Sequence, residues 1–295
     1  MTVDRYADVL GVRTRYVDVG EGPPVVLIHG GEPGSTASSD SWRCNIDALA
    51  AAGHRVIAPD RIGNGRTANP ATDDGFRMGN LCAHVAQLLE DLGVDGATVV
   101  GQSRGAFVAA HIALTHPRLV DRLVIVNSAS LSPAYGAFHS PVQANILGGP
   151  DNVRHDAEWY AVVHENITDE WVERTAQMLR DPERVATRTR MSSFKSTYLD
   201  DLDQEKAKLL GWLRSGSFTK PTAIIWGIGD PSTSLKDAVD LFEIFAGGGA
   251  SVRMHVISNC GHSPFFEYPD EFNAVLLGFT RTPPEAFDRH KESRG

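Results

Sequence analysis

The feature that most constrains the fold of this chain is a serine between two glycines, in the pentapeptide Gly-Gln-Ser-Arg-Gly at residues 101–105. A short apolar run at 97–100 precedes it and a helix-like apolar segment at 106–114 follows it. A sharp turn from a strand into a helix crowds the backbone, so the positions beside its central residue must be nearly free of side chain. The pattern therefore predicts that Ser103 stands at the carboxyl edge of a sheet, beside the positive end of a helix.

Short apolar runs alternate with helical segments along most of the chain, which predicts a parallel sheet covered by helices. An antiparallel hairpin at one sheet edge is expected over residues 7–19. Buried strands are expected at 25–28, 54–58, 97–100, 123–126, 221–226 and 252–257. Helices are expected at 75–92, 106–114, 235–245 and 269–279. The predicted fold class is α/β, with a mostly parallel eight-stranded sheet flanked by helices.

The alternation stops after residue 127, and no convincing buried strand occurs between residues 131 and 218. Helix-like segments with exposed charge are found there instead, at 156–163, 168–179 and 199–213. We interpret residues 131–218 as a helical cap inserted over the carboxyl edge of the sheet. Residues 1–130 and 219–295 would then form the core.

Two further residues fit a catalytic triad with Ser103. A serine hydroxyl is a weak nucleophile at neutral pH, so it needs a base that takes its proton and a carboxylate that orients the base. Asp230 directly follows the strand expected at 221–226, and His262 directly follows the last expected strand. The order Ser103, Asp230, His262 is the order that a serine on a strand–turn–helix elbow requires. Asn127 occupies the position after the earlier strand, so no acid is available there.

The negative oxygen formed during such a reaction needs two backbone N–H donors. One is predicted to be the amide of Arg104, directly after the nucleophile. The other is expected from the glycine-rich segment 29–34, which follows the strand at 25–28. We favour Gly31 as this second donor, because glycine lets the main chain approach a substrate closely.

The composition excludes several other classes of protein. The net charge is −9, and no run of Lys and Arg suggests a nucleic-acid partner. The first residues lack the apolar core of a signal peptide, and no apolar stretch is long enough to span a bilayer. Three scattered cysteines form neither a C-x-x-C pair nor a metal-ligand cluster. A cytoplasmic protein with no metal, no cofactor and no membrane partner is expected.

These motifs resemble those of the α/β-hydrolases, and within them the meta-cleavage-product hydrolases. The resemblance lies in segments 29–34, 58–67, the serine elbow through Pro117, 226–230 and 261–273, and it weakens in the cap. It implies hydrolysis of a carbon–carbon bond in a vinylogous 1,5-diketone formed by ring-opening of a catechol. A small-molecule substrate and a homodimer are also implied, since dimers are frequent in such enzymes.

The resemblance also implies residues that bind substrate. Arg174 falls where the family's cap arginine holds the dienoate carboxylate, and Ser41 corresponds to a polar group on the same carboxylate. Gln102 replaces a frequent asparagine before the nucleophile. Three positions depart from the family pattern, because Glu32 replaces a glycine, Arg104 a hydrophobic residue and Ser263 a tryptophan. The remaining expected pocket residues are Gly30, Trp226 and Phe265, with Phe266 beside it.

Three functions are compatible with the fold that these motifs predict. The first is a serine-triad hydrolase of a ring meta-cleavage product. The second is an esterase or lactonase, because the same machinery hydrolyses those bonds. The third is a non-catalytic receptor of the same fold, which is disfavoured because no triad member is missing.

Overall fold

An eight-stranded sheet forms the centre of the computed structural model, which describes residues 4–134, 149–216, 218–283 and 285–288. The strand order is β1-β2-β4-β3-β5-β6-β7-β8. β1 and β2 pair antiparallel, β2 is antiparallel to β4, and all pairs from β4 to β8 are parallel. The predicted fold class is confirmed. The strands are β1 (Asp4–Val9), β2 (Val12–Val19), β3 (Pro24–Ile28), β4 (Arg55–Pro59), β5 (Ala97–Gln102), β6 (Val120–Val126), β7 (Thr222–Gly227) and β8 (Val252–Ile257).

The predicted hairpin is longer than expected and begins at Asp4. Val9 pairs with Val12, so the connection has two residues, Leu10 and Gly11. Both adopt positive φ, as a two-residue type I′ turn requires. The backbone twist of this turn matches the twist of the two strands.

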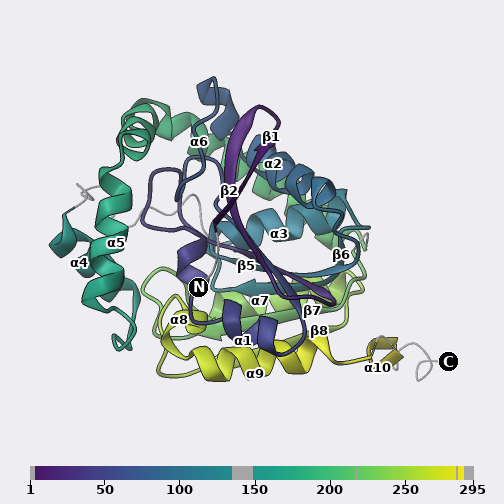
Figure 1. Ribbon diagram of the computed structural model, residues 1–295. Coiled ribbons are helices and arrows are strands. Elements are labelled where there is room, and N and C mark those ends of the chain that lie inside the picture. The colour runs from purple at the N-terminus through teal and green to yellow at the C-terminus, as the bar shows by residue number, and fades with distance from the viewer. Residues whose placement is uncertain (1–3, 135–148, 217, 284, 289–295) are drawn as a thin grey trace.

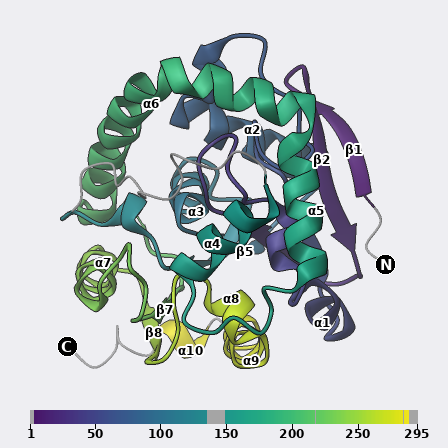
Figure 2. The same cartoon turned by 90° about the vertical axis from the view of Figure 1, so that its left-hand side faces the viewer.

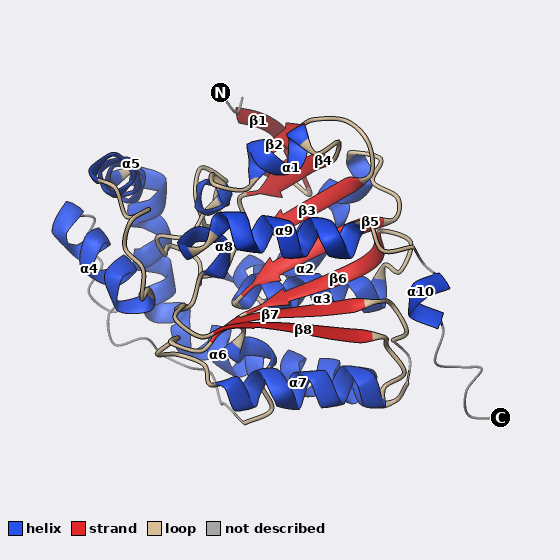
Figure 3. Cartoon of the chain, turned by 90° about the horizontal axis from the view of Figure 1, so that it is seen from below, coloured by secondary structure: helices blue, strands red, loops and turns tan. Residues whose placement is uncertain are grey.

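Helices cover both faces of the sheet (Figures 1 and 3). α2 (Met78–Asp91), α3 (Arg104–Thr115) and α7 (Leu235–Gly247) pack on one face, and α1 (Ile46–Ala51) and α9 (Pro269–Thr280) pack on the other. In β3, Val26 and Ile28 join the first cluster, whereas Val25 and Leu27 join the second. The strand is therefore apolar at successive positions because it is buried on both faces.

The described residues between β6 and β7 are mostly helical, and they lie at the end of the sheet to which the parallel strands point (Figures 2 and 3). They form η3 (Ala129–Leu131), α4 (Pro150–Tyr160), α5 (Asp169–Arg180) and α6 (Pro182–Arg214). The prediction of a helix at 156–163 is wrong at both ends. α4 starts at Pro150, since proline fits the first turn of a helix, and it stops at Tyr160. Part of the predicted cap, residues 135–148, lies outside the described residues.

α6 is much longer than the helix expected at 199–213. It has 33 residues, begins at Pro182 and curves over the molecule (Figure 2). The Asp181 side chain caps it by accepting a hydrogen bond from the amide of Glu183 at 2.8 Å. Its first half is rich in charged and hydroxyl side chains, so apolar periodicity did not reveal it.

The remaining short elements are η1 (Ser39–Trp42), η2 (Asp73–Phe76), α8 (Pro264–Glu267) and α10 (Glu285–Asp288). Among the described helices, none combines the length and the apolar character needed to cross a bilayer.

Candidate active site

Ser103 stands at the turn between β5 and α3 with a strained backbone, φ 53° and ψ −123°. A Cβ atom on Gly105 would lie 2.3 Å from the carbonyl oxygen of Ile28. A Cβ atom on Gly101 would lie 2.3 Å from the carbonyl oxygen of Gly105. Both glycines are therefore required sterically, for the reason expected from the sequence.

Asp230 and His262 form a buried pair at the ends of β7 and β8. His262 Nδ1 lies 2.6 Å from Asp230 Oδ2. Burial by itself raises the pKa of Asp230, but the charge of His262 and the hydrogen bonds from His262, Thr233 and Ser232 outweigh it, so the pKa is lowered. Asp230 therefore remains a carboxylate that keeps the Nδ1 proton of His262 in place and leaves Nε2 free to accept one.

Ser103 and His262 line the same cavity, which we call the serine cavity. The backbone amide of His262 donates to the carbonyl of Tyr160 at 2.8 Å, and the two rings are in tilted contact with centroids 5.0 Å apart. Of the other residues expected at the site, those that line this cavity are Gly31, Ser41, Gln102, Arg104, Ser263 and Phe265. The two expected oxyanion donors therefore belong to residues that face the same space as the serine.

Arg174, which was expected to bind the substrate carboxylate, lies outside the lining that the described residues give the serine cavity. Its side chain is 54% exposed and pairs with Asp40 at 3.2 Å. Helix α5 buries Val172, Ala176 and Leu179, and this packing turns Arg174 outward. Within the described part of the chain, Arg174 is not among the residues that line the serine cavity.

Trp226, Glu32 and Gly30 are likewise outside the serine-cavity lining formed by the described residues. Trp226 is fully buried in β7 and belongs to the core. Glu32 pairs with Arg104 at 3.6 Å and with Lys195 at 3.1 Å, so its charge is compensated. Gly30 packs directly behind Ser103, because a Cβ atom there would lie 2.8 Å from the Ser103 Cβ.

The glycine-rich segment after β3 is held by a buried arginine. Arg61 Nη2 donates to the carbonyl of Gly30 at 2.6 Å and also to the carbonyl of Gly31. His29 Nε2 accepts from the amide of Arg61 at 3.0 Å, and His29 Nδ1 lies 2.8 Å from the Gly30 carbonyl. Burial and the neighbouring Arg61 charge keep the pKa of His29 well below its usual value, so the ring is neutral. Arg61 and His29 thus fix the backbone that carries the Gly31 amide.

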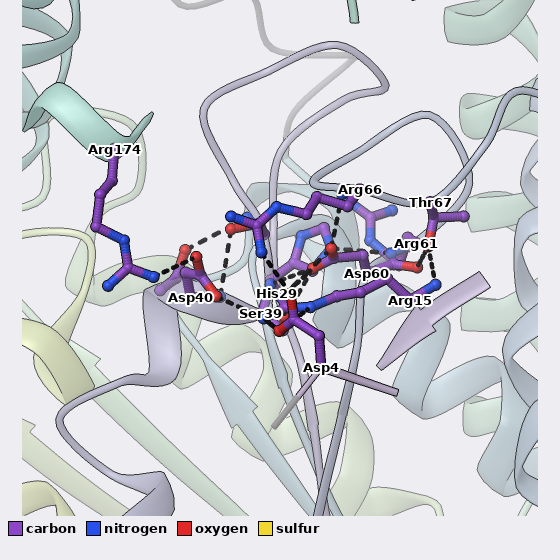
Figure 4. A network of polar contacts seen from close by, with 12 residues as sticks. Asp4, Arg15, His29, Ser39, Asp40, Asp60, Arg61, Arg66, Thr67 and Arg174 are labelled. Atoms are coloured by element: carbon purple, nitrogen blue, oxygen red, sulfur yellow. Dashed lines mark hydrogen bonds and ion pairs between the residues drawn. The ribbon is translucent and has the colours of Figure 1, made fainter. Parts of the chain in front are cut away.

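The segment after β4 is fixed by a second polar network around Asp60 (Figure 4). Asp60 is completely buried and accepts hydrogen bonds from the amide and hydroxyl of Ser39, both at 2.7 Å, and from the amide of Arg66 at 2.8 Å. Arg15 Nη1 lies 3.2 Å from Asp60 Oδ1, and its positive charge balances the buried carboxylate. This network holds η1, which precedes α1, against the Asp60 loop and is structural.

Sequence reasoning missed two charged residues of the serine cavity. Asp156 enters it from α4 and Lys206 from α6, beside the expected Arg104. Both missed side chains are almost completely buried. Lys206 pairs with Asp203 at 3.1 Å. No motif marks either position, because each belongs to a cap helix whose inner face depends on packing.

Aromatic residues give the serine cavity an apolar wall. Trp171 from α5, with Phe265 and Phe266 from α8, lines it. Trp171 and Phe266 have ring centroids 5.4 Å apart, and Phe265 stacks on Trp42 with centroids 3.9 Å apart. The cavity therefore combines an aromatic surface with a few charged groups.

Glu267 ties the histidine loop to the cap. Its Oε2 accepts from the amides of Val162 at 2.8 Å, Val163 at 3.0 Å and Gly261 at 2.9 Å. Its Oε1 accepts from the amide of Ser263 at 3.3 Å. One buried carboxylate thus satisfies backbone donors on both sides of His262 and directly after α4. The sequence resemblance included this residue without indicating its role.

The fold and the site geometry define an α/β-hydrolase, and the alpha/beta hydrolase fold family matches residues 23–269. The chain therefore belongs to this family and is an enzyme of the hydrolase class. It is 26% identical over 94% of its length to 2-hydroxy-6-oxo-6-(2'-aminophenyl)hexa-2,4-dienoic acid hydrolase of Metapseudomonas resinovorans, of which 90% is covered. It is 27% identical to 2-hydroxy-6-oxo-6-phenylhexa-2,4-dienoate hydrolase of Comamonas testosteroni, with 90% of each chain covered.

Solved structures give the same relationship. A meta-cleavage product hydrolase (CumD) matches with a TM-score of 0.79 and 26% identity, covering 95% of this chain and 99% of that one. A second structure of that enzyme, from Pseudomonas fluorescens IP01, matches with a TM-score of 0.78 and 27% identity, covering 94% of this chain and 97% of that one. The predicted resemblance to meta-cleavage-product hydrolases is confirmed.

Proposed function

We propose that the protein hydrolyses a carbon–carbon bond in a meta-cleavage product of an aromatic ring, a 2-hydroxy-6-oxohexa-2,4-dienoate, with Ser103, His262 and Asp230 as its triad. The observation that carries the proposal is that His262, paired with the buried Asp230, lines the same cavity as Ser103. The relatives named above support the substrate class, since their names describe dienoate hydrolases.

The bond changes are those of a hydrolysis. The proton of the 2-hydroxyl group first moves to C5 of the dienol and converts it to the keto form. Ser103 Oγ then gives its proton to His262 Nε2 and bonds to the C6 ketone carbon. The C5–C6 bond breaks, its electron pair leaves with the five-carbon fragment as a dienolate, and His262 Nε2 gives its proton to that dienolate, which departs as 2-hydroxypentadienoate. His262, neutral again, takes a proton from the water that attacks the acyl group, and returns it to Ser103 Oγ as the acyl group leaves as a carboxylic acid.

The charge that develops on the ketone oxygen would be held by the amides of Arg104 and Gly31. Arg61 keeps the Gly31 backbone in place through its carbonyl contacts. The side chains of Arg104 and Lys206 give the serine cavity the positive charge that a carboxylate substrate needs. They take the role that was expected of Arg174.

The test uses the purified enzyme and synthetic 2-hydroxy-6-oxo-6-phenylhexa-2,4-dienoate, whose yellow colour is lost on cleavage. Formation of benzoate and 2-hydroxypenta-2,4-dienoate in equal amounts is expected. Ser103→Ala should lower the rate by about 10³-fold or more. Turnover of aryl esters or lactones without any dienoate cleavage would replace this function by the esterase or lactonase one.

A further inference from the structure

Asp156 is a buried carboxylate of the serine cavity that the triad chemistry does not use. It lies on α4 and is only 3% exposed. Its Oδ2 accepts a hydrogen bond from Thr36 Oγ1 at 3.2 Å. Its Oδ1 is shielded from solvent and has no hydrogen-bond partner among the described residues. One oxygen is thus fixed by Thr36, and the other is left for a molecule in the cavity.

The surroundings of Asp156 permit the charged form at neutral pH. Burial raises its pKa to about 6, although the Thr36 hydrogen bond and the nearby His155 and His262 favour the carboxylate. A carboxylate only accepts hydrogen bonds. A buried acceptor without a partner is unfavourable, and a bound N–H or O–H group removes this cost. A carbonyl or a carboxylate of the ligand would be repelled from the same place.

The other charges of the serine cavity limit which part of the substrate reaches Asp156. Arg104 and Lys206 are the cationic side chains among the described lining residues, and the proposed function assigns the dienoate carboxylate to them. The 2-hydroxyl group of a dienoate is attached to the carbon beside that carboxylate. Placing this hydroxyl on Asp156 would bring two carboxylates close together, which is unfavourable in a buried site. The donor must therefore lie on the group carried by the C6 ketone.

We propose that Asp156 determines specificity by binding a hydroxyl or amino substituent on the acyl group, so that the enzyme prefers ring-fission products whose C6 substituent carries such a donor. This inference rests on the proposed function, because it assigns the acyl group to the serine cavity. It predicts that simple phenyl substrates are poorer than their hydroxylated or aminated counterparts.

The first experiment measures binding without turnover. Dissociation constants of benzoate, its 2-, 3- and 4-amino isomers and the matching methoxy isomers are measured by calorimetry at pH 8. At least one amino isomer should bind about tenfold to hundredfold more tightly than benzoate, because a hydrogen bond to a charged group is among the stronger ones. Its methoxy counterpart should show no such gain.

Asp156→Asn and Asp156→Leu should reduce this preference to less than about twofold, since neither keeps the charge. Asp151→Asn is the matched control, because Asp151 is exposed on the same helix. Circular dichroism verifies that both variants are folded. If Asp156→Leu does not fold, the isosteric Asp156→Asn variant alone decides the outcome. Equal binding of all isomers by the wild type, or a preference that survives both substitutions, would overturn the proposal.

The second experiment compares kcat/KM for the 6-phenyl and 6-(aminophenyl) dienoates. The amino substrate should be favoured by the wild type and not by Asp156→Asn. If no dienoate is cleaved but the Asp156-dependent binding preference remains, the proposed function fails and the donor site stands. If both dienoates are cleaved equally by both enzymes, the donor site fails and the proposed function stands.

Discussion

The side-chain amide of Asn127 donates a hydrogen bond of 2.9 Å to Asp230 Oδ2, the same oxygen that pairs with His262. Asn127 Nδ2 also donates to the carbonyl of Gly227 at 3.0 Å, and Asn127 Oδ1 accepts a hydrogen bond from the amide of Gly227 at 2.9 Å. This one side chain therefore connects the end of β6 to the end of β7 and supports the Asp230 carboxylate that pairs with His262.

Asn127→Ala should lower both stability and turnover. Three buried hydrogen bonds disappear, so we expect a loss of about 2–3 kcal/mol in the free energy of unfolding. We also expect about a tenfold fall in kcat, because Asp230 and His262 lose part of their support. Urea unfolding and steady-state kinetics measure the two effects. Asn152→Ala, at an exposed site on α4, should change neither; an unchanged kcat in Asn127→Ala would contradict the supporting role.

Asp156→Asn should stabilise the protein at high pH. The folded-state pKa of Asp156, about 6, lies above the usual 3.8, so its favourable contribution is complete below pH 4 and is lost as pH rises through 6. Asparagine stays neutral, and the variant should gain about 2–3 kcal/mol over the wild type between pH 4 and pH 8. Unfolding curves at the two pH values test this. A gain that does not depend on pH would argue against a buried ionisable group.

Arg174→Ala should leave KM for a dienoate within about twofold of the wild type, because Arg174 is exposed and its pair with the half-buried Asp40 is a surface ion pair of the kind that contributes little. Arg104→Met and Lys206→Met should each raise KM about tenfold or more, since a buried cation beside the substrate carboxylate is lost. Arg104→Met keeps the backbone amide and hence the expected oxyanion donor. A large KM increase in Arg174→Ala alone would restore the role expected from the sequence.

Arg61→Lys should reduce kcat about tenfold with little change in KM. A lysine ammonium cannot reproduce the two carbonyl contacts of the Arg61 guanidinium in the same geometry. The amide of Gly31 would then be less well placed for the developing charge. Single-turnover measurements separate this effect from product release, and an unaltered chemical step would show that the loop needs no such support.

The core of the fold and the positions of Ser103, Asp230 and His262 in it were predictable because strong local constraints mark them. Ser103 required two glycines at a strand–helix turn, and the structure gives the steric reason. Asp230 and His262 each follow a buried strand, and parallel strands bring their carboxyl ends to one edge. In all three cases a few neighbouring residues contain the necessary information.

The cap was less predictable because its geometry depends on tertiary packing. Arg174 was assigned to the substrate from its position in a motif, but the buried face of α5 directs it to Asp40. Asp156 and Lys206 lie on helices whose inner faces are not evident from periodicity. Each helical residue turns by about 100°, so a one-residue difference in alignment moves a side chain to another face.

Glu267 has a consequence for how this enzyme can diversify. Its carboxylate binds backbone amides at 162 and 163 as well as those beside His262, so the segment after α4 and the His262 loop share one anchor. A change in length at residues 160–163 would therefore shift His262 together with this part of the cavity wall. Substitutions at Trp171 of α5 or Lys206 of α6, by contrast, change the cavity lining without touching this anchor.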